Sequence, residues 1–388
     1  MSRRPLNRAL DGFTSTIFAE MSALAMRTAS VNLGQGFPDF DGPDSMLQRA
    51  QQAIADGVNQ YPPGSGDPML RSAIAAHQQR FYGIELDPDS QVLVTAGATE
   101  GIAAAMLGLL EPGDEVVLLE PYYDSYAATI ALAGGVRRPI RLEPPDFALP
   151  REAFAAALTP RTRLLLINSP HNPTGAVLGA DDLAFVAELA VRHDVLVVTD
   201  EVYEHLTYDG VGHLPLSTLP GMAERTVTLS SAGKTFSATG WKIGWATGPD
   251  ELVAAVRAAK QFLTYVNGAP FQPAIAEALQ LPDSYFDGFR TAMQDKRDRL
   301  IDGLTRAGIA TFRPRGTYFV VADSRSLGYP DGYELCRALP ELCGVVAVPM
   351  QVFYDNPDGA RHLVRFAYCK RDEVLDEAVR RLGTLRRN

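Results

Sequence analysis

Continuous apolar runs of strand length recur through the middle of the chain and alternate with helical patterns. The runs cover residues 91–95, 115–120, 163–168, 195–200, 226–230 and 243–247. A strand that is apolar at every position is buried on both faces, which is typical of a parallel sheet covered by helices. Segments with a helical period, such as 99–110 and 180–193, lie between the runs. The sequence therefore predicts an α/β fold with a mostly parallel central sheet flanked by helices.

The pattern changes near residue 283, which predicts three parts in this chain of 388 residues. A large domain is expected over 46–283 and a smaller α+β domain over 284–388. The elements expected in the smaller domain are a charged helix over 284–307, strands over 316–322 and 363–368, and a closing helix over 371–383. Residues 1–45 are predicted to form an N-terminal arm and a segment of the small domain. The first 30 residues lack an obvious core of their own, so they are expected to pack on another surface, such as a second subunit.

Composition excludes several classes of protein. The net charge of −10 argues against a nucleic-acid binder with a basic surface. Three cysteines without a C-x-x-C pair exclude a disulfide framework and a cysteine zinc site, so no metal is expected. No run of 18 apolar residues suits a membrane span, and the N-terminus lacks the apolar region of a secretory signal. These features predict a cytoplasmic protein that contacts neither nucleic acid nor membrane.

Polar and aromatic side chains follow the predicted strands. In an open α/β sheet, ligands bind beyond the carboxyl ends of the strands. The residues near those ends include Ala98, Thr99, Tyr123, Asn168, Asn172, Asp200, Tyr203, Ser231 and Lys234. The sequence therefore predicts a ligand site at this edge of the sheet.

Lys234 has two possible chemical roles and one structural one. Residues 233–235 match the end of a phosphate-binding loop, G-x-x-x-x-G-K-[ST], but Thr228 stands where the first glycine is needed. A lysine desolvated behind a buried strand has a lowered pKa and can form a Schiff base with a carbonyl group. An exposed loop lysine is the structural alternative, and the neighbouring residues favour the reactive amine.

Asp200 ends an apolar strand, so its carboxylate is expected to be partly buried. A buried carboxylate needs a cationic partner, and the protonated pyridine nitrogen of pyridoxal phosphate is one. Tyr203 and Asn172 can donate hydrogen bonds to a phenolate oxygen. The structural alternatives are a helix cap for Asp200, core packing for Tyr203 and a turn for Asn172. The combination favours a cofactor site.

Several sequence blocks resemble the signatures of fold-type I, class I/II pyridoxal-phosphate aminotransferases. The blocks are NSPHNPTG (168–175), DEVYEHL (200–206), SSAGKTFSATGWKIGW (230–245) and LVRFAYCK (363–370). Three others, NLGQGFPDF (32–40), NQYPPGSG (59–66) and EPYYDSY (120–126), are similar to the branch of kynurenine, glutamine and methionine aminotransferases and of the N-succinyldiaminopimelate aminotransferases of lysine biosynthesis. The resemblance implies a homodimer with shared active sites, pyridoxal 5'-phosphate as cofactor, and amino-group transfer between an L-amino acid and a 2-oxo acid.

The resemblance also implies roles for individual residues. Lys234, Asp200 and Tyr203 are the implied catalytic residues, of which Lys234 would bind the cofactor covalently and Asp200 would hold its ring nitrogen protonated. The implied cofactor-binding residues are Ala98, Thr99, Tyr123, Asn172, Asp200, Tyr203, Ser231, Lys234, Lys242 and, from the neighbouring subunit, Tyr61. The implied substrate-binding residues are Gly36, Asn168, Asn172, Arg365 and Phe18. Arg365 would bind the substrate α-carboxylate through two parallel hydrogen bonds.

The substrate is less constrained than the chemistry. The resemblance favours N-succinyl-LL-diaminopimelate with 2-oxoglutarate. Three alternatives stay open: transamination of methionine, glutamine or kynurenine, β-elimination from cysteine conjugates, and a non-catalytic ligand-sensing domain. Phe18, Phe37 and Tyr122 are expected to form a wall for the substrate side chain. His171 is expected to tune the site or to be structural, His205 to pack in a helix, and the cysteines to be inert.

Overall fold

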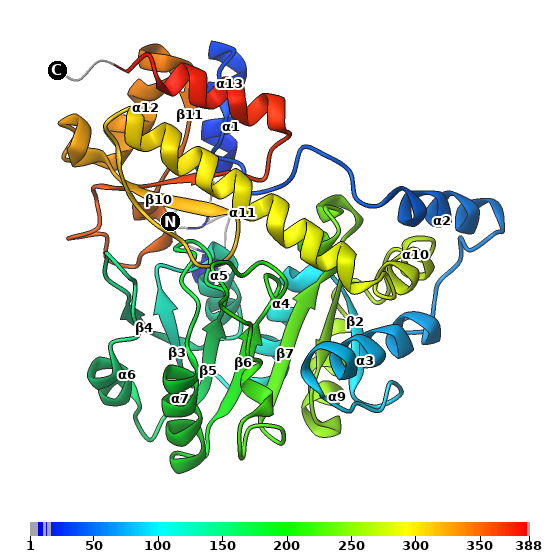
Figure 1. Ribbon diagram of the computed structural model, residues 1–388. Helices are drawn as coiled ribbons and strands as arrows, with labels where there is room; N and C mark the ends of the chain where they lie inside the picture. Colours follow the sequence, from blue (N-terminus) through cyan, green and yellow to red (C-terminus); the bar gives the residue numbers. More distant parts are fainter. Residues whose placement is uncertain (1–6, 11–12, 14–16, 386–388) are drawn as a thin grey trace, which may run out of the picture.

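The computed structural model describes residues 7–10, 13 and 17–385. Its centre is a seven-stranded sheet (Figure 1). The strands lie in the order β2 (Val92–Ala96), β8 (Ile243–Thr247), β7 (Thr226–Ser231), β6 (Leu196–Asp200), β5 (Thr162–Asn168), β3 (Glu115–Glu120) and β4 (Val136–Arg141). All six predicted runs are strands, and β4 is an addition to them. The predicted α/β class is therefore confirmed.

Helices cover both faces of this sheet. They are α2 (Asp44–Ala55), α3 (Pro68–Tyr82), α4 (Gly97–Leu109), α5 (Asp124–Leu132), α6 (Arg151–Ala157), α7 (Ala180–Arg192), α9 (Asp250–Lys260) and α10 (Phe271–Ala278), with short 3-10 turns η1 (Arg8–Leu10) and η2 (Leu216–Thr218). Successive residues of β5 point to opposite faces. Leu165 packs in the cluster that contains Val186 of α7, and Leu166 packs in the cluster that contains Ile102 of α4. Burial on both faces explains why the strands are apolar at every position.

The sheet is mostly parallel, with β8 as the exception. β4, β3, β5, β6 and β7 run parallel, whereas β8 is antiparallel to both β7 and β2. The connection from β7 to β8 holds only α8 (Ala232–Thr235) and η3 (Thr239–Trp241), and a parallel return needs a crossover of roughly a dozen residues or more. The chain therefore turns back at the carboxyl end of β7, and Lys234 lies in that turn.

The C-terminal third forms a second, antiparallel sheet with its own helices, in the upper part of Figure 1. Its strand order is β12 (Val348–Pro349), β13 (Leu363–Ala367), β10 (Phe319–Asp323) and β9 (Ala310–Phe312). The helices are α11 (Asp283–Arg306), α12 (Gly332–Cys343) and α13 (Asp372–Leu382), with turns η4 (Ser324–Leu327) and η5 (Met350–Phe353). β1 (Val31–Asn32) pairs with β11 (Val345–Val346). Because β1 lies before residue 45 and β11 lies after residue 283, this pairing supports the placement of an N-terminal segment with the small domain. The domain boundaries at residues 45 and 283 stay a proposal.

The N-terminal helix packs on its own chain. Met21 and Ala25 of α1 (Ile17–Thr28) are buried in the core cluster that also holds Leu339 of α12. Glu20 forms an ion pair with Arg337 of α12 at 2.9 Å. For α1, the surface it packs on belongs to its own chain, and contact with a second subunit is not tested by a single chain. Residues 1–6, 11–12 and 14–16 of the expected arm lie outside the described residues.

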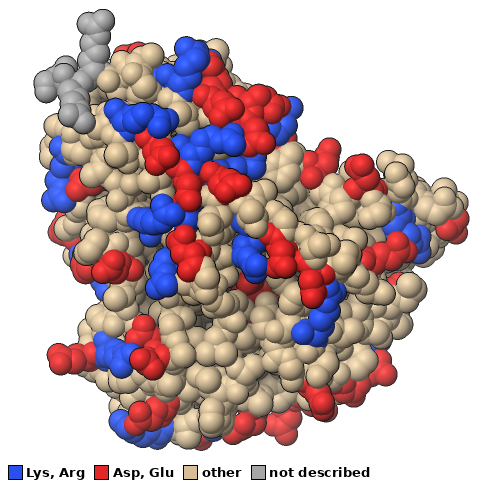
Figure 2. Space-filling view, viewed as in Figure 1, with Lys and Arg blue, Asp and Glu red and all other residues tan. Residues whose placement is uncertain are grey.

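The visible surface carries both signs of charge. Figure 2 shows acidic and basic side chains interleaved over the upper part of the molecule. Arg299 of α11 contacts both Asp372 and Asp376 of α13, at 3.1 Å each. Within the described ranges, no helix combines the length and apolar character that crossing a bilayer requires.

Candidate active site

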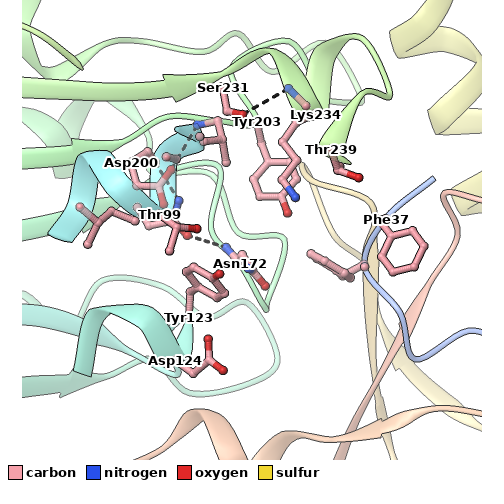
Figure 3. A pocket seen from close by; sticks show the side chains of 18 of the residues that line it. Phe37, Thr99, Tyr123, Asp124, Asn172, Asp200, Tyr203, Ser231, Lys234 and Thr239 are labelled. Atoms are coloured by element: carbon pink, nitrogen blue, oxygen red, sulfur yellow. Dashed lines mark hydrogen bonds between the residues drawn. The ribbon is translucent and has the colours of Figure 1, made fainter. Parts of the chain in front are cut away.

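One cavity of about 430 Å³ lies at the carboxyl ends of the sheet strands. The predicted site residues that line it are Phe18, Gly36, Ala98, Thr99, Tyr123, Asn168, Asn172, Asp200, Tyr203, Ser231, Lys234, Lys242 and Arg365. Figure 3 shows Asp200, Tyr203, Lys234 and Asn172 approaching the same space from different segments. The structure thus brings together residues that are up to 347 positions apart in sequence, from Phe18 to Arg365 (365 − 18).

Strand ends position these side chains. Asn168 ends β5, Asp200 ends β6 and Ser231 ends β7, because parallel strands place their carboxyl ends at one edge of the sheet. Lys234 follows in α8. Arg365 reaches the cavity from β13 of the C-terminal sheet. The cavity is therefore closed by both sheets.

The Asp200 carboxylate is buried, with 4% of the residue exposed. Its Oδ2 accepts a hydrogen bond from the Tyr126 hydroxyl at 2.6 Å, and its Oδ1 accepts one from the Val202 amide at 3.3 Å. Burial raises the pKa of Asp200, and these two neutral donors only partly offset that effect. A cationic group placed in the cavity beside Asp200 would stabilise the carboxylate.

The Lys234 amine lies among aromatic rings. Its Nζ atom is 5.8 Å from the ring centre of Tyr203 and 5.8 Å from that of Tyr318. Burial lowers the pKa of Lys234, because the charged ammonium is poorly solvated there. A larger share of the side chain is therefore the free amine at neutral pH, which is the nucleophilic form.

A positive region lies at the start of α4. The residue before the helix, Ala96, supplies no side-chain cap to the first backbone N–H groups of the helix. Gly97 has a φ of 72°, and a Cβ built on it would lie 3.4 Å from the Lys242 Nζ. The Lys242 ammonium therefore lies across the helix N-terminus. A helix N-terminus beside an ammonium group is suited to a phosphate.

The Arg365 guanidinium is buried in an aromatic box, with 2% of the residue exposed. It lies 4.0 Å from the ring centre of Phe319 and 5.4 Å from that of Phe18. Its Nη1 donates to the Asn172 Oδ1 at 3.0 Å, whereas its Nε has no hydrogen-bond partner among the described residues. Burial lowers the pKa of Arg365 to about 10, so the group is still cationic at neutral pH. A buried cation with a free N–H is suited to a carboxylate ligand.

Asn168 lines the cavity, but its side chain is already engaged. Its Nδ2 donates to the Asp200 carbonyl at 2.7 Å and to the Pro170 carbonyl at 3.2 Å. Its Oδ1 accepts from the Asn172 backbone N–H at 2.7 Å. Asn168 thus ties the segment that carries Asn172 to the end of β6, a contact that its spacing in the sequence does not indicate.

Two predicted residues lie away from the cavity. Tyr122 is 3% exposed and its hydroxyl donates to Asp355, so the expectation that it forms part of the substrate wall is wrong. Consecutive residues after β3 point in different directions, and Tyr123 takes the place at the cavity. Tyr61 is 81% exposed and its ring contacts Tyr265 edge-on. Its expected role in a neighbouring subunit is not tested by a single chain.

Two histidines of the signature blocks, His171 and His205, do not line the cavity. His171 is buried, its Nδ1 lies 2.7 Å from the Thr174 hydroxyl, and burial lowers its pKa to about 3. His205 lies in a turn rather than in the expected helix, and its Nε2 is 2.9 Å from the Nε2 of His77. Glu204 lies near both rings, a grouping that metal ligands also show. The two ring nitrogens point at each other, which is the geometry of a hydrogen-bonded pair.

Sequence reasoning missed several residues of the cavity. They are Gln35, Ile102, Asp124, Thr239 and Phe319. Tyr126 was also missed, although its hydroxyl donates a hydrogen bond to Asp200. A tyrosine within a helical pattern does not reveal from the sequence which strand its side chain will contact. The three cysteines are buried and unpaired.

Comparisons with known proteins agree with this geometry. The pattern of the family Aminotransferase class I and II matches residues 28–382. The N-succinyldiaminopimelate aminotransferase of Mycobacterium tuberculosis is 58% identical over 96% of this chain and 96% of its own. The solved structure of an N-succinyldiaminopimelate aminotransferase from the same organism aligns with 98% of this chain and 100% of its own, with a TM-score of 0.96. The methionine aminotransferase of Escherichia coli is 39% identical over 99% of this chain and 100% of its own. Kynurenine–oxoglutarate transaminase 3 of Mus musculus is 36% identical over 96% of this chain and 88% of its own.

The mostly parallel sheet, with a buried lysine and a buried carboxylate at its carboxyl edge, is the architecture of fold-type I enzymes that use pyridoxal phosphate. The chain belongs to the class I and II aminotransferases. It is an aminotransferase whose cofactor is pyridoxal phosphate and whose substrates are small molecules.

Proposed function

We propose that this enzyme transfers the amino group of N-succinyl-LL-diaminopimelate, with 2-oxoglutarate and glutamate as the second pair, in lysine biosynthesis. The observation that carries the choice is the identity of 58% over nearly the whole length to the enzyme that bears this substrate in its name. The methionine and kynurenine enzymes reach 39% and 36%. A cytoplasmic location is part of the proposal, since three unpaired cysteines suit a reducing compartment.

The lining of the cavity fits the cofactor. Bound pyridoxal phosphate supplies an electron sink for the bond cleaved at the substrate Cα. We assign Lys234 as the residue that binds it covalently and carries a proton to and from Cα. Asp200 holds a proton on the ring nitrogen, and its buried carboxylate, whose donors Tyr126 and Val202 are neutral, supports this role. Tyr203 and Asn172 bind the O3′ oxygen.

The phosphate and ring contacts complete the cofactor site. We assign the phosphate to the N-terminus of α4, and the uncapped first turn beside the Lys242 ammonium supports this assignment. The residues at that end are Ala98, Thr99, Ser231 and Lys242. Tyr123, which also lines the cavity, is the residue that would stack on the cofactor ring.

Arg365 binds the α-carboxylate in both half-reactions, because each substrate presents the same arrangement at Cα. The unpaired Nε and the planar fork of the guanidinium support this role. Gly36 contributes its backbone, whose carbonyl is fixed by the Tyr318 hydroxyl at 2.7 Å. Phe18 and Phe37 also line the cavity.

The same lining favours a second candidate function. The cations among the described lining residues are Lys234, Lys242 and Arg365, and all three are already assigned to the cofactor or to the α-carboxylate. Aromatic rings of Phe18, Phe37 and Phe319 dominate the remaining wall. An apolar wall suits methionine or an aromatic amino acid, so transamination of such substrates is the runner-up. The distal carboxylates of the succinylated substrate then need donors from outside this lining.

A panel of amino donors with 2-oxoglutarate decides between the two functions. We expect kcat/KM to be largest for N-succinyl-LL-diaminopimelate, by at least about tenfold over methionine, glutamine and kynurenine, which is about 1.4 kcal/mol of transition-state preference. Steady-state formation of glutamate is the readout. The reverse order would favour the runner-up, and release of ammonia and pyruvate from cysteine conjugates would show β-elimination instead.

We propose that the enzyme is a homodimer whose active sites are shared between subunits. Exposed aromatic side chains at two adjacent loops support the interface: Tyr61 is 81% exposed, Phe262 83% and Tyr265 49%. The rings of Tyr61 and Tyr265 are 5.7 Å apart, so the two loops form one surface. Exposed apolar surface of this kind is typical of protein interfaces. Tyr61 then reaches the phosphate of the neighbouring site.

Mixing two inactive variants tests the sharing. We expect Tyr61→Ala and Lys234→Ala each to have little activity alone. In the heterodimer, one site carries both changes and the other carries neither, so activity should rise to about a quarter of the wild-type value when equal amounts exchange subunits randomly. The rate after exchange is compared with that of the unmixed variants. If subunit exchange is demonstrated by mass and activity stays at the unmixed level, the sites are not shared.

A further inference from the structure

Lys242 has an unusual backbone conformation for a residue with a side chain. Its φ is 54° and its ψ is 45°, which is the left-handed region. This region is unfavourable for residues other than glycine, so neighbouring contacts must hold it. Lys242 directly precedes β8, and Gly97 directly follows β2. The two residues therefore face each other where the β2–β8 ladder ends at the pair Ala96–Ile243.

The Asn267 side chain bridges this point. Its Nδ2 donates to the Lys242 carbonyl at 2.8 Å and to the Thr95 carbonyl at 3.2 Å. Both amide hydrogens are thus used, one on each strand end. The Asn267 side chain therefore links β2 to Lys242 at the point where the hydrogen bonds of the β2–β8 pair end.

The orientation of this amide follows from its partners. The reverse orientation would place Oδ1 against two carbonyl oxygens, which cannot donate a hydrogen bond. Oδ1 instead lies buried without a partner in the described structure. An asparagine is therefore required for its two donors rather than for its acceptor.

Neighbouring contacts fix the segment that carries Asn267. Gln272 donates from Nε2 to the Asn267 carbonyl at 2.6 Å. Thr264 donates from its backbone N–H to Glu100 of α4 at 3.1 Å, and the other carboxylate oxygen of Glu100 accepts from the Ala96 N–H at 2.6 Å. The loop after α9 is thus tied to the N-terminus of α4, where the Lys242 ammonium lies.

We propose that Asn267 is a positioning residue for the phosphate site: it holds Lys242 in its left-handed conformation against the end of β2 and so keeps the Lys242 ammonium at the N-terminus of α4. Asn267 does not line the cavity itself, so it acts through Lys242. The inference rests on the phosphate role proposed for Lys242. The loop that carries Asn267 lies outside the cavity and, on this proposal, contributes part of the affinity for the cofactor.

Cofactor affinity of the apo-protein tests this role without any measurement of turnover. Pyridoxal phosphate and pyridoxal, which lacks the phosphate, are titrated into wild type, Asn267→Ala and Asn267→Asp, with absorbance as the readout. We expect Asn267→Ala to raise the Kd of pyridoxal phosphate about tenfold and to change that of pyridoxal less than about twofold. Asn267→Asp, which puts an oxygen against two carbonyl oxygens, should raise the Kd of pyridoxal phosphate further. Asn356→Ala is the matched control, because this side chain also bonds backbone and does not line the cavity.

A double-mutant cycle with Lys242→Met separates positioning from a general structural effect. If Asn267 acts through Lys242, Asn267→Ala should weaken binding less than about twofold in the Lys242→Met background. Equal weakening of pyridoxal and pyridoxal phosphate, an undiminished effect in that background, or unchanged affinity in both Asn267 variants would each overturn the inference. If Asn267→Asp does not fold, Asn267→Ala decides alone. Unchanged affinity in Lys242→Met would instead refute the proposed phosphate role of Lys242.

Discussion

Asp200→Asn and Asp200→Ala are expected to lower kcat about 10³-fold or more, which corresponds to about 4 kcal/mol of transition-state stabilisation. The Asp200 carboxylate is buried and its hydrogen-bond donors are neutral. Its charge is therefore available to hold a proton on the ring nitrogen of the cofactor. Without that charge, the protein would no longer hold the proton on that nitrogen, and the electron sink that the bound cofactor supplies would be weaker. Stopped-flow single turnovers give the rate of the chemical step.

The two Asp200 variants separate charge from packing. Asn keeps the shape of the side chain and one oxygen that accepts a hydrogen bond from the Tyr126 hydroxyl. It therefore removes the charge and, besides it, only the weaker hydrogen bond from the Val202 N–H at 3.3 Å. Tyr126→Phe is the matched control, because it removes a neutral donor and leaves the carboxylate; we expect less than about tenfold loss of kcat there. Turnover of Asp200→Asn within tenfold of the wild type would show that Asp200 does not protonate the cofactor.

Lys234→Ala is expected to abolish turnover, with a loss of about 10⁴-fold or more in kcat. The side chain has two tasks, the covalent bond to the cofactor and proton transfer at Cα, and alanine can perform neither. Lys234→Arg should be equally inactive, because a guanidinium stays protonated and is not a nucleophile. Steady-state assays with saturating cofactor measure the loss.

Added methylamine provides the control for Lys234. A small primary amine that enters the cavity can take the place of the missing side-chain amine as a proton carrier. We expect it to restore activity to Lys234→Ala in proportion to its concentration and to leave Asp200→Ala unchanged. Near-normal turnover of Lys234→Ala without added amine would contradict both roles of the lysine.

The central sheet was predictable because its strands are buried on both faces. Each strand was visible as an unbroken apolar run, and the functional side chains follow those runs within a few residues. The reversal of β8 was not predictable from its composition. β8 is as apolar as its parallel neighbours, and only the short connection over 232–242 distinguishes it.

Other parts of the cavity come from distant segments and gave no local signal. Phe319 lines the cavity from β10, and Asp124 does so from the first turn of α5. Tyr122 was expected at the cavity, whereas its hydroxyl binds Asp355 in the C-terminal third. Which of two adjacent tyrosines faces the ligand depends on packing between the sheets, and a sequence pattern does not contain that information.

Reduction of the holoenzyme with borohydride, followed by peptide mapping, tests the central claim most directly. Reduction fixes a covalently bound cofactor to the side chain that carries it. The lysines of the chain are Lys234, Lys242, Lys260, Lys296 and Lys370, so the map has few candidates. We expect a yellow protein that loses its colour on reduction and carries one phosphopyridoxyl group per chain, on the peptide that contains Lys234. The label on any other lysine, or no label on a protein that is active with the bound cofactor, would contradict the account.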